Sequence, residues 1–396
     1  MVSSLGDLDA WRFVARDEAE SLIAAAVESI ELPPAQQAAG VSALRREWSR
    51  ERVHAAMQLA IARRKASDRL TIPDLIADPE GVEMATPADV ARHKADRLVA
   101  TADGAPVLDL CTGIGGDAAM LPSAELVELD PIRAWMAEHN TGHRPGVCDA
   151  ERADVGGRVV HLDPARRAGG RRIPRYADLL PGPAIIERVA RDSRAACIKL
   201  NPGIDGDMLP AGELEIISRR GTLNQAVLWT GACAQHARSA TLIDATGTAH
   251  TLAGEVSDAP HAPLGPFIAT VDPAAERAGL LGVLGDALGV GMPHARLGLF
   301  SADAVRTSPW LAWFEVLDVL EWRRDRVKRA LAAYDAGVVE VKTRAQVVDP
   351  DIEQKALRGS GGSLLTVFVY RFDDGKQRSI KAIITRRCSL PSPTSR

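Results

Sequence analysis

The stretch VLDLCTGIGGDA, residues 107–118, decides the fold of this protein. A β-rich run comes first, and Gly113, Gly115 and Gly116 then form a tight turn into a segment that Asp117 opens. Glycines in such a turn let the backbone approach a ligand at the carboxyl end of the first strand of a doubly wound sheet, where nucleotides bind. By itself the stretch also fits the loose dinucleotide pattern of oxidoreductases, and a tight turn that binds nothing.

β-rich and helical runs alternate on the C-terminal side of this turn. The β-rich runs are VLDL, ELVEL, RVVHL and AACIKL, and the helical ones are DAAML, PIRAWMAEHN and AIIERVARDS. This alternation predicts βαβ units around a parallel sheet. We therefore expect an α/β fold with a Rossmann-like sheet over residues 101–257, in which the later runs ELEIIS, QAVLWTG and SATLID form a β extension.

The flanking regions have different patterns. Residues 1–100 repeat apolar residues at helical spacing and predict a helical N-terminal domain. Residues 258–304 begin with the Pro- and Gly-rich DAPHAPLGPF and are expected to form a connecting segment. Residues 305–388 combine helical and β-rich runs with a DDG hairpin signal, and predict a small α+β domain. Residues 389–396 are expected to be a disordered tail.

The composition excludes several classes of protein. Of 396 residues, 46% are hydrophobic and 25% are charged, which excludes collagen-like, coiled-coil and wholly disordered proteins. No apolar run approaches the roughly 20 residues that span a bilayer, and Asp7, Asp9 and Arg12 interrupt the region where a signal peptide needs an apolar stretch. The five cysteines have no metal or redox spacing. We therefore expect a cytoplasmic protein with no membrane and no metal partner.

Acidic residues follow the next predicted strands. ELVELDP ends with Glu128 and Asp130. A carboxylate at the end of the second strand can accept both hydroxyls of a ribose, which makes Glu128 the ribose candidate. Asp130 precedes Pro131 and is expected to cap the following helix. Asp149 follows a third strand, where it either accepts a hydrogen bond from an adenine amino group or is a solvated loop acid.

A further motif is RVVHLDPARRAGGRR, in which a strand delivers Asp163 and Pro164 to the same edge of the sheet. An aspartate there can orient a substrate amine or accept its proton. The arginines that follow can engage phosphates, or they belong to a capped, exposed loop. The candidates for binding nucleic acid are Arg166, Arg167, Arg171 and Arg172. The next strand, in IKLNPG, ends at Asn201.

This order of motifs resembles the class I S-adenosylmethionine-dependent methyltransferases. A glycine loop follows strand one, an acid strand two, Asp-Pro strand four and Asn-Pro strand five. The resemblance implies that S-adenosylmethionine lies over the first two strands, with its methyl group facing a catalytic set of Asp163, Pro164 and Asn201. The implied cofactor-binding residues are Asp109, Cys111, Thr112, Gly113, Gly115, Gly116, Glu128 and Asp149. No metal is implied, because direct transfer depends mainly on positioning.

Two RNA-modifying branches are similar in more detail. GVEMATPADVARHKADRL is similar to the T-P-E-x-I-A-x-H-x-A-x-R segment of trimethylguanosine synthases, and LDPARRAGG resembles the D-P-A-R-x-G loop of the RNA uracil-C5 methyltransferases. The chain departs from the uracil branch because Leu200 replaces its cysteine nucleophile. Ala165 and Arg166 replace the aromatic residue that stacks on a base in amine methyltransferases, which leaves Trp229, Tyr176 or an attached domain as candidates for that role.

The chain as a whole resembles bacterial class I methyltransferases with a THUMP-like C-terminal domain. Although the net charge is −4, bases cluster in residues 45–69, 323–329 and 376–387, which is typical of nucleic-acid binders or of solvated faces. We expect a methyltransferase that modifies a nitrogen of a structured RNA, such as tRNA or rRNA, without metal or covalent intermediate. The alternatives are a non-catalytic RNA-binding scaffold and methylation of a small molecule or protein. A dinucleotide oxidoreductase would not explain the Asp-Pro-Ala-Arg-Arg motif.

Overall fold

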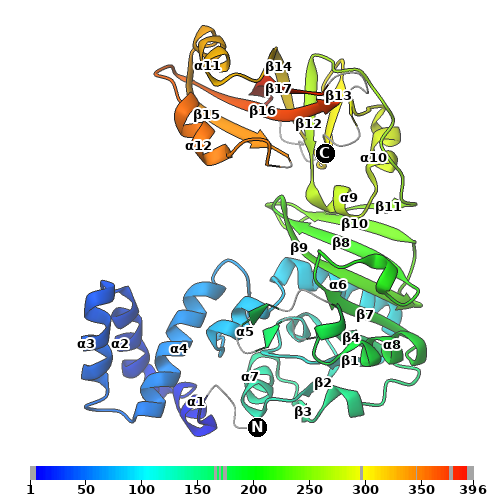
Figure 1. The fold of residues 1–396 in the computed structure, drawn as a ribbon. Helices are drawn as coiled ribbons and strands as arrows, with labels where there is room; N and C mark the ends of the chain where they lie inside the picture. Colours follow the sequence, from blue (N-terminus) through cyan, green and yellow to red (C-terminus); the bar gives the residue numbers. More distant parts are fainter. Residues whose placement is uncertain are drawn as a thin grey trace. The chain divides into compact units, whose positions relative to one another are not determined.

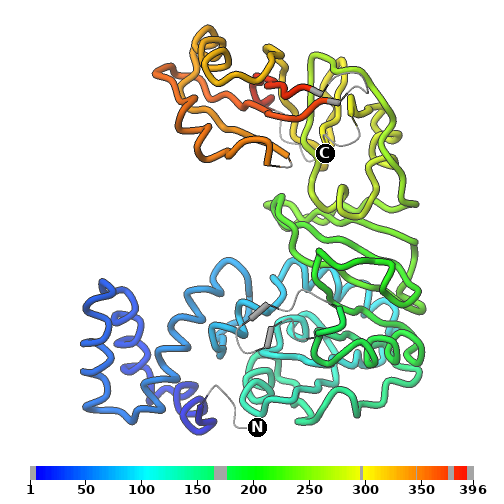
Figure 2. Tube along the Cα trace, in the orientation of Figure 1, coloured from blue at the N-terminus to red at the C-terminus, as the bar shows by residue number. Residues whose placement is uncertain are grey.

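The chain divides into two compact units. The computed structural model describes residues 6–164, 167–168, 171–172, 176–294, 298–344, 346–373 and 378–389, and Figure 2 follows their course from the N- to the C-terminus. Unit 1 comprises Met1–Glu215 and Gln225–His236, and unit 2 comprises Ile216–Asn224 and Ala237–Arg396. The chain therefore passes between the units three times, and each unit is described by itself.

The N-terminal part of unit 1 is helical, as the spacing of its apolar residues predicts (Figure 1). Its helices are α1 (Leu8–Val14), α2 (Glu20–Glu31), α3 (Pro34–Leu44), α4 (Arg50–Ala66), α5 (Pro79–Met84) and α6 (Ala88–Ala102), with a 3₁₀ turn η1 (Asp17–Ala19). Trp11, Leu22 and Val53 are fully buried, in a hydrophobic cluster that also contains Ile114 and Met136. The first helices therefore share one core with the glycine turn.

The rest of unit 1 is built around a mainly parallel sheet. The strands of this sheet that lie wholly in unit 1 are β1 (Val107–Leu110), β2 (Ala124–Glu128), β3 (Gly146–Val147), β4 (Val159–Leu162) and β7 (Ala195–Leu200), while β8 (Glu213–Arg219) and β9 (Thr222–Gly231) are divided between the units. The strands β5 (Arg167–Ala168) and β6 (Arg171–Arg172) form a separate pair. The helical elements of this part of unit 1 are η2 (Ala118–Met120), α7 (Pro131–Thr141), η3 (Ala150–Arg152), η4 (Tyr176–Asp178), α8 (Pro183–Asp192) and η5 (Gly206–Met208). The alternation that the sequence predicts is confirmed, with η2 as a very short first core helix.

The strand order places the predicted motifs next to one another. Within unit 1 the order is β9-β7-β4-β1-β2-β3, with every pair parallel except β7 and β9. The order reverses between β1 and β4, and ligands of doubly wound sheets bind at such a switch point. The glycine turn follows β1, Glu128 ends β2 and Asp163 follows β4. All three therefore lie at the same carboxyl edge.

Unit 2 is an α+β assembly. Its elements are β10 (Arg238–Ile243), β11 (Ala249–Gly254), β12 (Phe267–Val271), α9 (Pro273–Arg277), α10 (Leu281–Leu288), β13 (Leu299–Ala302), β14 (Leu311–Glu321), α11 (Arg324–Ala333), β15 (Ala336–Thr343), α12 (Pro350–Leu357), β16 (Ser363–Asp373) and β17 (Arg378–Arg387). Six of its strands form a sheet in the order β13-β12-β14-β17-β16-β15. The predicted hairpin is confirmed, because β16 and β17 pair antiparallel with Asp373 opposite Arg378; Asp374 and Gly375 lie outside the described residues.

One face of this second sheet packs against helices. Val327 and Leu331 of α11 and Leu357 of α12 are buried in one cluster with Val339 and Val341 of β15. Among the residues that the structure describes, no helix in either unit is long and apolar enough to cross a membrane.

Candidate functional site

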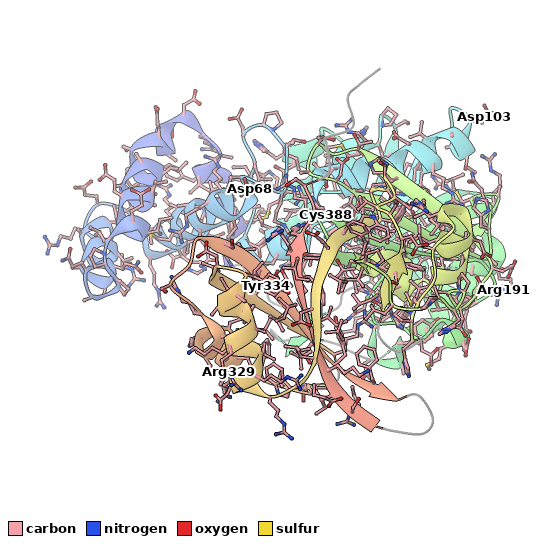
Figure 3. The ribbon with its side chains drawn as sticks, turned by 90° about the horizontal axis from the view of Figure 1, so that it is seen from above. Asp68, Asp103, Arg191, Arg329, Tyr334 and Cys388 are labelled. Carbon is pink, nitrogen blue, oxygen red and sulfur yellow. The ribbon has the colours of Figure 1, made fainter. Side chains whose placement is uncertain are left out.

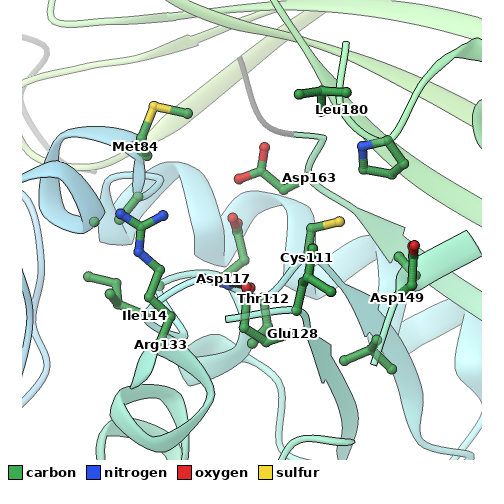
Figure 4. A pocket seen from close by; sticks show the side chains of 18 of the residues that line it. Met84, Cys111, Thr112, Ile114, Asp117, Glu128, Arg133, Asp149, Asp163 and Leu180 are labelled. Atoms are coloured by element: carbon green, nitrogen blue, oxygen red, sulfur yellow. Dashed lines mark hydrogen bonds between the residues drawn. The ribbon is translucent and has the colours of Figure 1, made fainter. Parts of the chain in front are cut away.

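A cavity of about 450 Å³ opens at the carboxyl edge of the sheet in unit 1. Met84 and Arg133 lie at one end of it and Asp149 at the other, with Cys111 and Asp163 between them (Figure 4). Of the residues predicted to bind the cofactor or to act in catalysis, those that line the cavity are Cys111, Thr112, Gly113, Gly116, Glu128, Asp149 and Asp163. The structure therefore brings together the motifs that follow β1, β2, β3 and β4.

Other predicted site residues do not line this cavity. Asp109 is 1% exposed, and its carboxylate accepts hydrogen bonds from Thr112 and His161 instead. Pro164 is buried behind the rim, and Oδ1 of Asn201 accepts a hydrogen bond from the Gly203 backbone N–H at 3.0 Å. Gly115 is absent from the cavity wall as well, so the sequence predicts ligand contact for four residues that do not line this cavity.

The glycine turn is shaped for close approach. Gly113 and Gly115 have φ angles of +60° and +85°, which side chains rarely adopt. A Cβ on Gly115 would lie 2.7 Å from Cγ2 of Thr141, so this glycine packs against α7. A Cβ on Gly116 would lie 3.0 Å from Cβ of Ala85, beside the cavity. The turn therefore leaves space on the cavity side that a side chain would reduce.

Glu128, at the end of the neighbouring strand β2, accepts a hydrogen bond from the glycine turn. Its Oε2 accepts a hydrogen bond from the Gly113 backbone N–H at 2.8 Å, and its Oε1 accepts one from the Asp130 N–H at 2.9 Å. Burial raises the pKa of the Glu128 carboxyl. Asp130 caps α7 as predicted, since its Oδ1 accepts from the N–H groups of Ile132 and Arg133. Each carboxylate oxygen of Glu128 has a second lone pair that a ligand hydroxyl can use.

Asp149 lies at the far end of the cavity and opens the 3₁₀ turn η3. Its Oδ1 accepts a hydrogen bond from the Glu151 N–H at 3.0 Å. The side chain therefore combines a capping role with a place on the cavity wall.

Asp163 forms an ion pair with a residue that the sequence analysis missed. Its Oδ2 lies 2.6 Å from Nζ of Lys199, whose side chain is 1% exposed. The same ammonium donates to the carbonyl oxygen of Met84 at 3.0 Å. Oδ1 of Asp163 is buried and has no hydrogen-bond partner among the described residues. A lysine inside the apolar run AACIKL was the available signal.

A second buried ion pair lies beside the first. Nζ of Lys94, on α6, lies 2.7 Å from Oδ1 of Asp117 and 3.0 Å from Nε2 of His161. Because an ammonium can only donate, Nε2 of His161 accepts, and the Nδ1–H donates to Oδ1 of Asp109 at 2.6 Å. This chain of contacts runs from the first strand of the sheet to Asp117 on the cavity wall.

The two charges of this second pair stabilise each other. Burial lowers the pKa of Lys94, but the neighbouring Asp117 outweighs that effect and the pKa is raised overall. Burial likewise raises the pKa of Asp117, but the attraction of the Lys94 and Lys199 ammonium groups outweighs it and holds the pKa well below its usual range. Asp117 therefore stays ionised beside the cavity.

The segment that resembles trimethylguanosine synthases anchors α6 to the sheet. Nε2 of His93 lies 2.7 Å from Oε1 of Glu215, and Arg97 forms an ion pair with Glu213. Trp229 is fully buried, donates its Nε1–H to Glu215 at 2.7 Å and packs under Arg97. The suggestion that Trp229 stacks on a base is therefore wrong, since no face of the indole is accessible.

Tyr176 and Cys197 are also buried. Tyr176 is 6% exposed, and burial raises its pKa. Cys197 is fully buried on β7, and Cys111 lines the cavity; burial raises the pKa of both thiols well above the ordinary value. Both cysteines therefore remain protonated thiols at neutral pH.

Much of the arginine-rich loop, residues 165–175, lies outside the described residues. Arg166 lies outside the described residues, and the side chains of Arg167, Arg171 and Arg172 do as well. Their backbone forms the antiparallel pair β5 and β6.

A family described as THUMP domain-like matches residues 311–387, which lie in unit 2. Proteins from two strains of Mycobacterium tuberculosis, CDC 1551 and H37Rv, are each 32% identical to the chain over 354 residues, covering 83% of it and 96% of their own length. Both are described as uncharacterised S-adenosylmethionine-dependent methyltransferases.

A solved structure from Porphyromonas gingivalis W83, provisionally described as a methyltransferase, is similar in fold. It is 15% identical, with a TM-score of 0.69, and the match covers 93% of this chain and 99% of that one. At this identity the likeness concerns the fold alone.

Proposed function

Because the chain belongs to the S-adenosylmethionine-dependent methyltransferases, we propose that it methylates a nitrogen atom of a structured RNA by direct transfer. The observation that carries the choice of nitrogen is Asp163, a residue of the cavity wall whose Oδ1 is buried and has no hydrogen-bond partner among the described residues. A buried carboxylate oxygen without a partner is costly, so it is suited to accept a hydrogen bond that the substrate brings.

The residues of the cavity fit S-adenosylmethionine. Glu128 at the end of β2 would accept the ribose hydroxyls, Asp149 would lie near the adenine, and the Gly113–Gly116 turn leaves room for close approach. When bound, the cofactor supplies a methyl group on a positively charged sulfonium. The carboxylates of Glu128, Asp149 and Asp117 make the wall negative, which favours a cation.

The chain's own residues then position the substrate. Asp163 would accept an N–H from the substrate nitrogen and so direct its lone pair toward the methyl group, which is catalysis by orientation. A covalent route through a cysteine finds little support. Cys197 is fully buried on the face of β7 opposite Leu200, and its raised pKa disfavours the thiolate that such a route needs.

The RNA part of the proposal rests on unit 2. The THUMP-like match covers most of its six-stranded sheet and α11. Helix α11 carries exposed bases, among them Arg326, Lys328 and Arg329, the last labelled in Figure 3. Exposed bases on one helix are suited to the phosphate backbone of RNA.

Transfer to cell fractions tests the proposal. The wild-type protein is incubated with methyl-labelled S-adenosylmethionine and, separately, with RNA, protein and small-molecule fractions from a strain that lacks the gene. We expect label in RNA, at a nitrogen when nucleosides are analysed by mass spectrometry. Label confined to the protein or small-molecule fraction would refute the RNA substrate.

Two variants sharpen this test. Asp163→Ala should bind the cofactor in isothermal titration calorimetry yet lose transfer, because it removes the acceptor and leaves Glu128 in place. The double variant Arg326→Glu with Arg329→Glu should bind RNA more weakly, with a smaller dependence on salt. Unchanged RNA binding by the double variant would remove α11 from the RNA surface.

A further inference from the structure

We propose that Lys199 is a positioning residue that holds Asp163 as a fixed hydrogen-bond acceptor, so that the enzyme methylates only nitrogens that carry a hydrogen. This rests on the proposed function in taking nitrogen as the methylated atom. It adds a residue to the site and narrows the substrate to neutral amino groups. Ring nitrogens that offer only a lone pair are excluded.

Of the two carboxylate oxygens of Asp163, only Oδ2 has a hydrogen-bond donor among the described residues. Nζ of Lys199 lies 2.6 Å from Oδ2 of Asp163, while Oδ1 has no hydrogen-bond partner among the described residues. The Lys199 side chain is 1% exposed, and its ammonium also donates to the Met84 carbonyl at 3.0 Å. With Oδ2 held in this way, Oδ1 is the oxygen of this cavity-wall residue that still has no donor among the described residues.

The register of the sheet explains why Lys199 reaches Asp163. Leu162 of β4 lies opposite Ile198 of β7 in a parallel pair, so Asp163 and Lys199 come next on the two strands. Side chains alternate along a strand, which places both on the face opposite that of Leu162 and Ile198. Met84 ends α5 and lines the cavity, so Lys199 connects three separate elements around the site.

A second buried ion pair lies beside the Asp163–Lys199 pair. The groups that act on this region are Lys94 and Asp117, which pair with each other at 2.7 Å, and the thiol of Cys111. Each of the two carboxylates therefore has a buried ammonium at contact distance, and Lys199 also attracts Asp117. The Asp163–Lys199 pair is neutral as a whole, so it offers little attraction to a cationic substrate.

The chemical consequence concerns which nitrogen can bind. A carboxylate can accept a hydrogen bond but cannot donate one. A neutral amino group can donate an N–H to Oδ1 and keep its lone pair free to attack the methyl group. In that attack a nitrogen–carbon bond forms, the carbon–sulfur bond breaks to leave a thioether, and the surplus proton on nitrogen passes to water. A ring nitrogen without hydrogen would place its lone pair against Oδ1, which is repulsive.

The test uses the single variants Lys199→Met, Lys199→Arg and Asp163→Asn, together with a double variant that combines Lys199→Met and Asp163→Asn. Each is compared with the wild type. Cofactor affinity is measured by calorimetry, and kcat and KM by label transfer to the three cell fractions. We expect Lys199→Met to lower kcat roughly 10- to 100-fold, the range for losing a hydrogen bond to a charged group, with cofactor affinity nearly unchanged. Lys199→Arg should restore much of the loss.

The double variant shows whether Lys199→Met acts by releasing Asp163 or by destabilising the fold. In the Asp163→Asn background no buried carboxylate is left unpaired, so Lys199→Met should fold and should change kcat little further. Lys65→Met is the matched control, because Lys65 pairs with Glu83 on an exposed surface, and it should behave as the wild type.

Any of four results would overturn the inference. Two concern the variants: full activity of Lys199→Met, and a loss in Lys199→Met that is equally large in the Asp163→Asn background. Two concern the product: methylation of a nitrogen that carries no hydrogen, and absence of transfer to nitrogen in all three fractions. Label on an amino group of protein, with the same dependence on Lys199, would refute the RNA substrate and support the role of Lys199.

Discussion

Nδ1 of His161 lies 2.6 Å from Oδ1 of Asp109, and the two residues are direct neighbours on the parallel strands β4 and β1. The acid that ends the first strand is therefore engaged inside the sheet. Asp117, eight residues later, takes the place on the cavity wall, and Lys94 connects it to His161. The charge of Asp117 at the cavity thus depends on a buried lysine from α6.

We expect Lys94→Met to destabilise the protein by about 3–5 kcal/mol, because removing one partner leaves an uncompensated buried charge on Asp117. Urea unfolding followed by circular dichroism measures the change. Adding Asp117→Asn to Lys94→Met should recover part of the stability, since the remaining group is neutral. A loss of less than about 1 kcal/mol, the size typical of exposed ion pairs, would contradict this account.

The same pair predicts how stability depends on pH. The pKa of Asp117 is lower in the folded protein than in the unfolded chain, so its contribution is present above the ordinary aspartate value of about 3.9 and is lost as the pH falls below it. The pKa of Lys94 is raised, so its contribution is present below about pH 10.4 and is lost as the pH rises through the folded value.

Urea midpoints between about pH 2 and pH 7 test the acid side, where carboxylates titrate. Asp117→Asn should be less stable than the wild type at neutral pH and should show a shallower loss on acidification. Parallel curves for the two proteins would mean that Asp117 does not supply this pH dependence.

Glu128→Gln should weaken binding of S-adenosylmethionine roughly 10- to 100-fold, because it removes a charged acceptor for hydroxyl groups. The amide also places an N–H₂ group where the carboxylate now accepts from the backbone. Isothermal titration calorimetry measures the affinity. The control is Glu125→Gln on the same strand, where the side chain is 56% exposed and pairs with Arg158. Equal affinities for both variants would exclude Glu128 from the cofactor site.

Gly115→Ala should destabilise the protein more than Gly113→Ala does. Both positions have positive φ angles, for which an alanine costs about 1–2 kcal/mol. At Gly115 the new Cβ would also lie 2.7 Å from Thr141, which adds overpacking of about 1–3 kcal/mol. Nothing lies within 4 Å of a Cβ at Gly113. Urea unfolding of both variants checks the order, and a reversed order would show that contact with α7 does not limit the turn.

Short-range patterns identified much of the fold and part of the site. The alternation of strands and helices predicted the parallel sheet, and Asp130 before Pro131 predicted the cap of α7. The ends of β1, β2, β3 and β4 predicted the cavity wall, including Glu128 and Asp163. These features depend on neighbours in the sequence, because parallel strands always bring their carboxyl ends to one edge.

The paired charges required the tertiary structure. Lys94 lies 67 residues from His161, and Lys199 lies 36 residues from Asp163. A polar residue inside an apolar run, as in RVVHL and AACIKL, signals that a buried partner is needed but does not identify it. The register of β4 against β1 and β7, and the placement of α6 over them, select the partners.

The sequence by itself determined a Rossmann-like methyltransferase sheet, its glycine turn and the acids at its edge, since local periodicity and turn chemistry suffice for these. Only the tertiary structure decided that Asp109 lies behind the cavity, that Asp117 lies on its wall, and that Lys199 leaves one oxygen of Asp163 without a partner among the described residues. The reason is physical: a buried charge is stable only beside its counter-charge, and the fold alone decides which two charges meet.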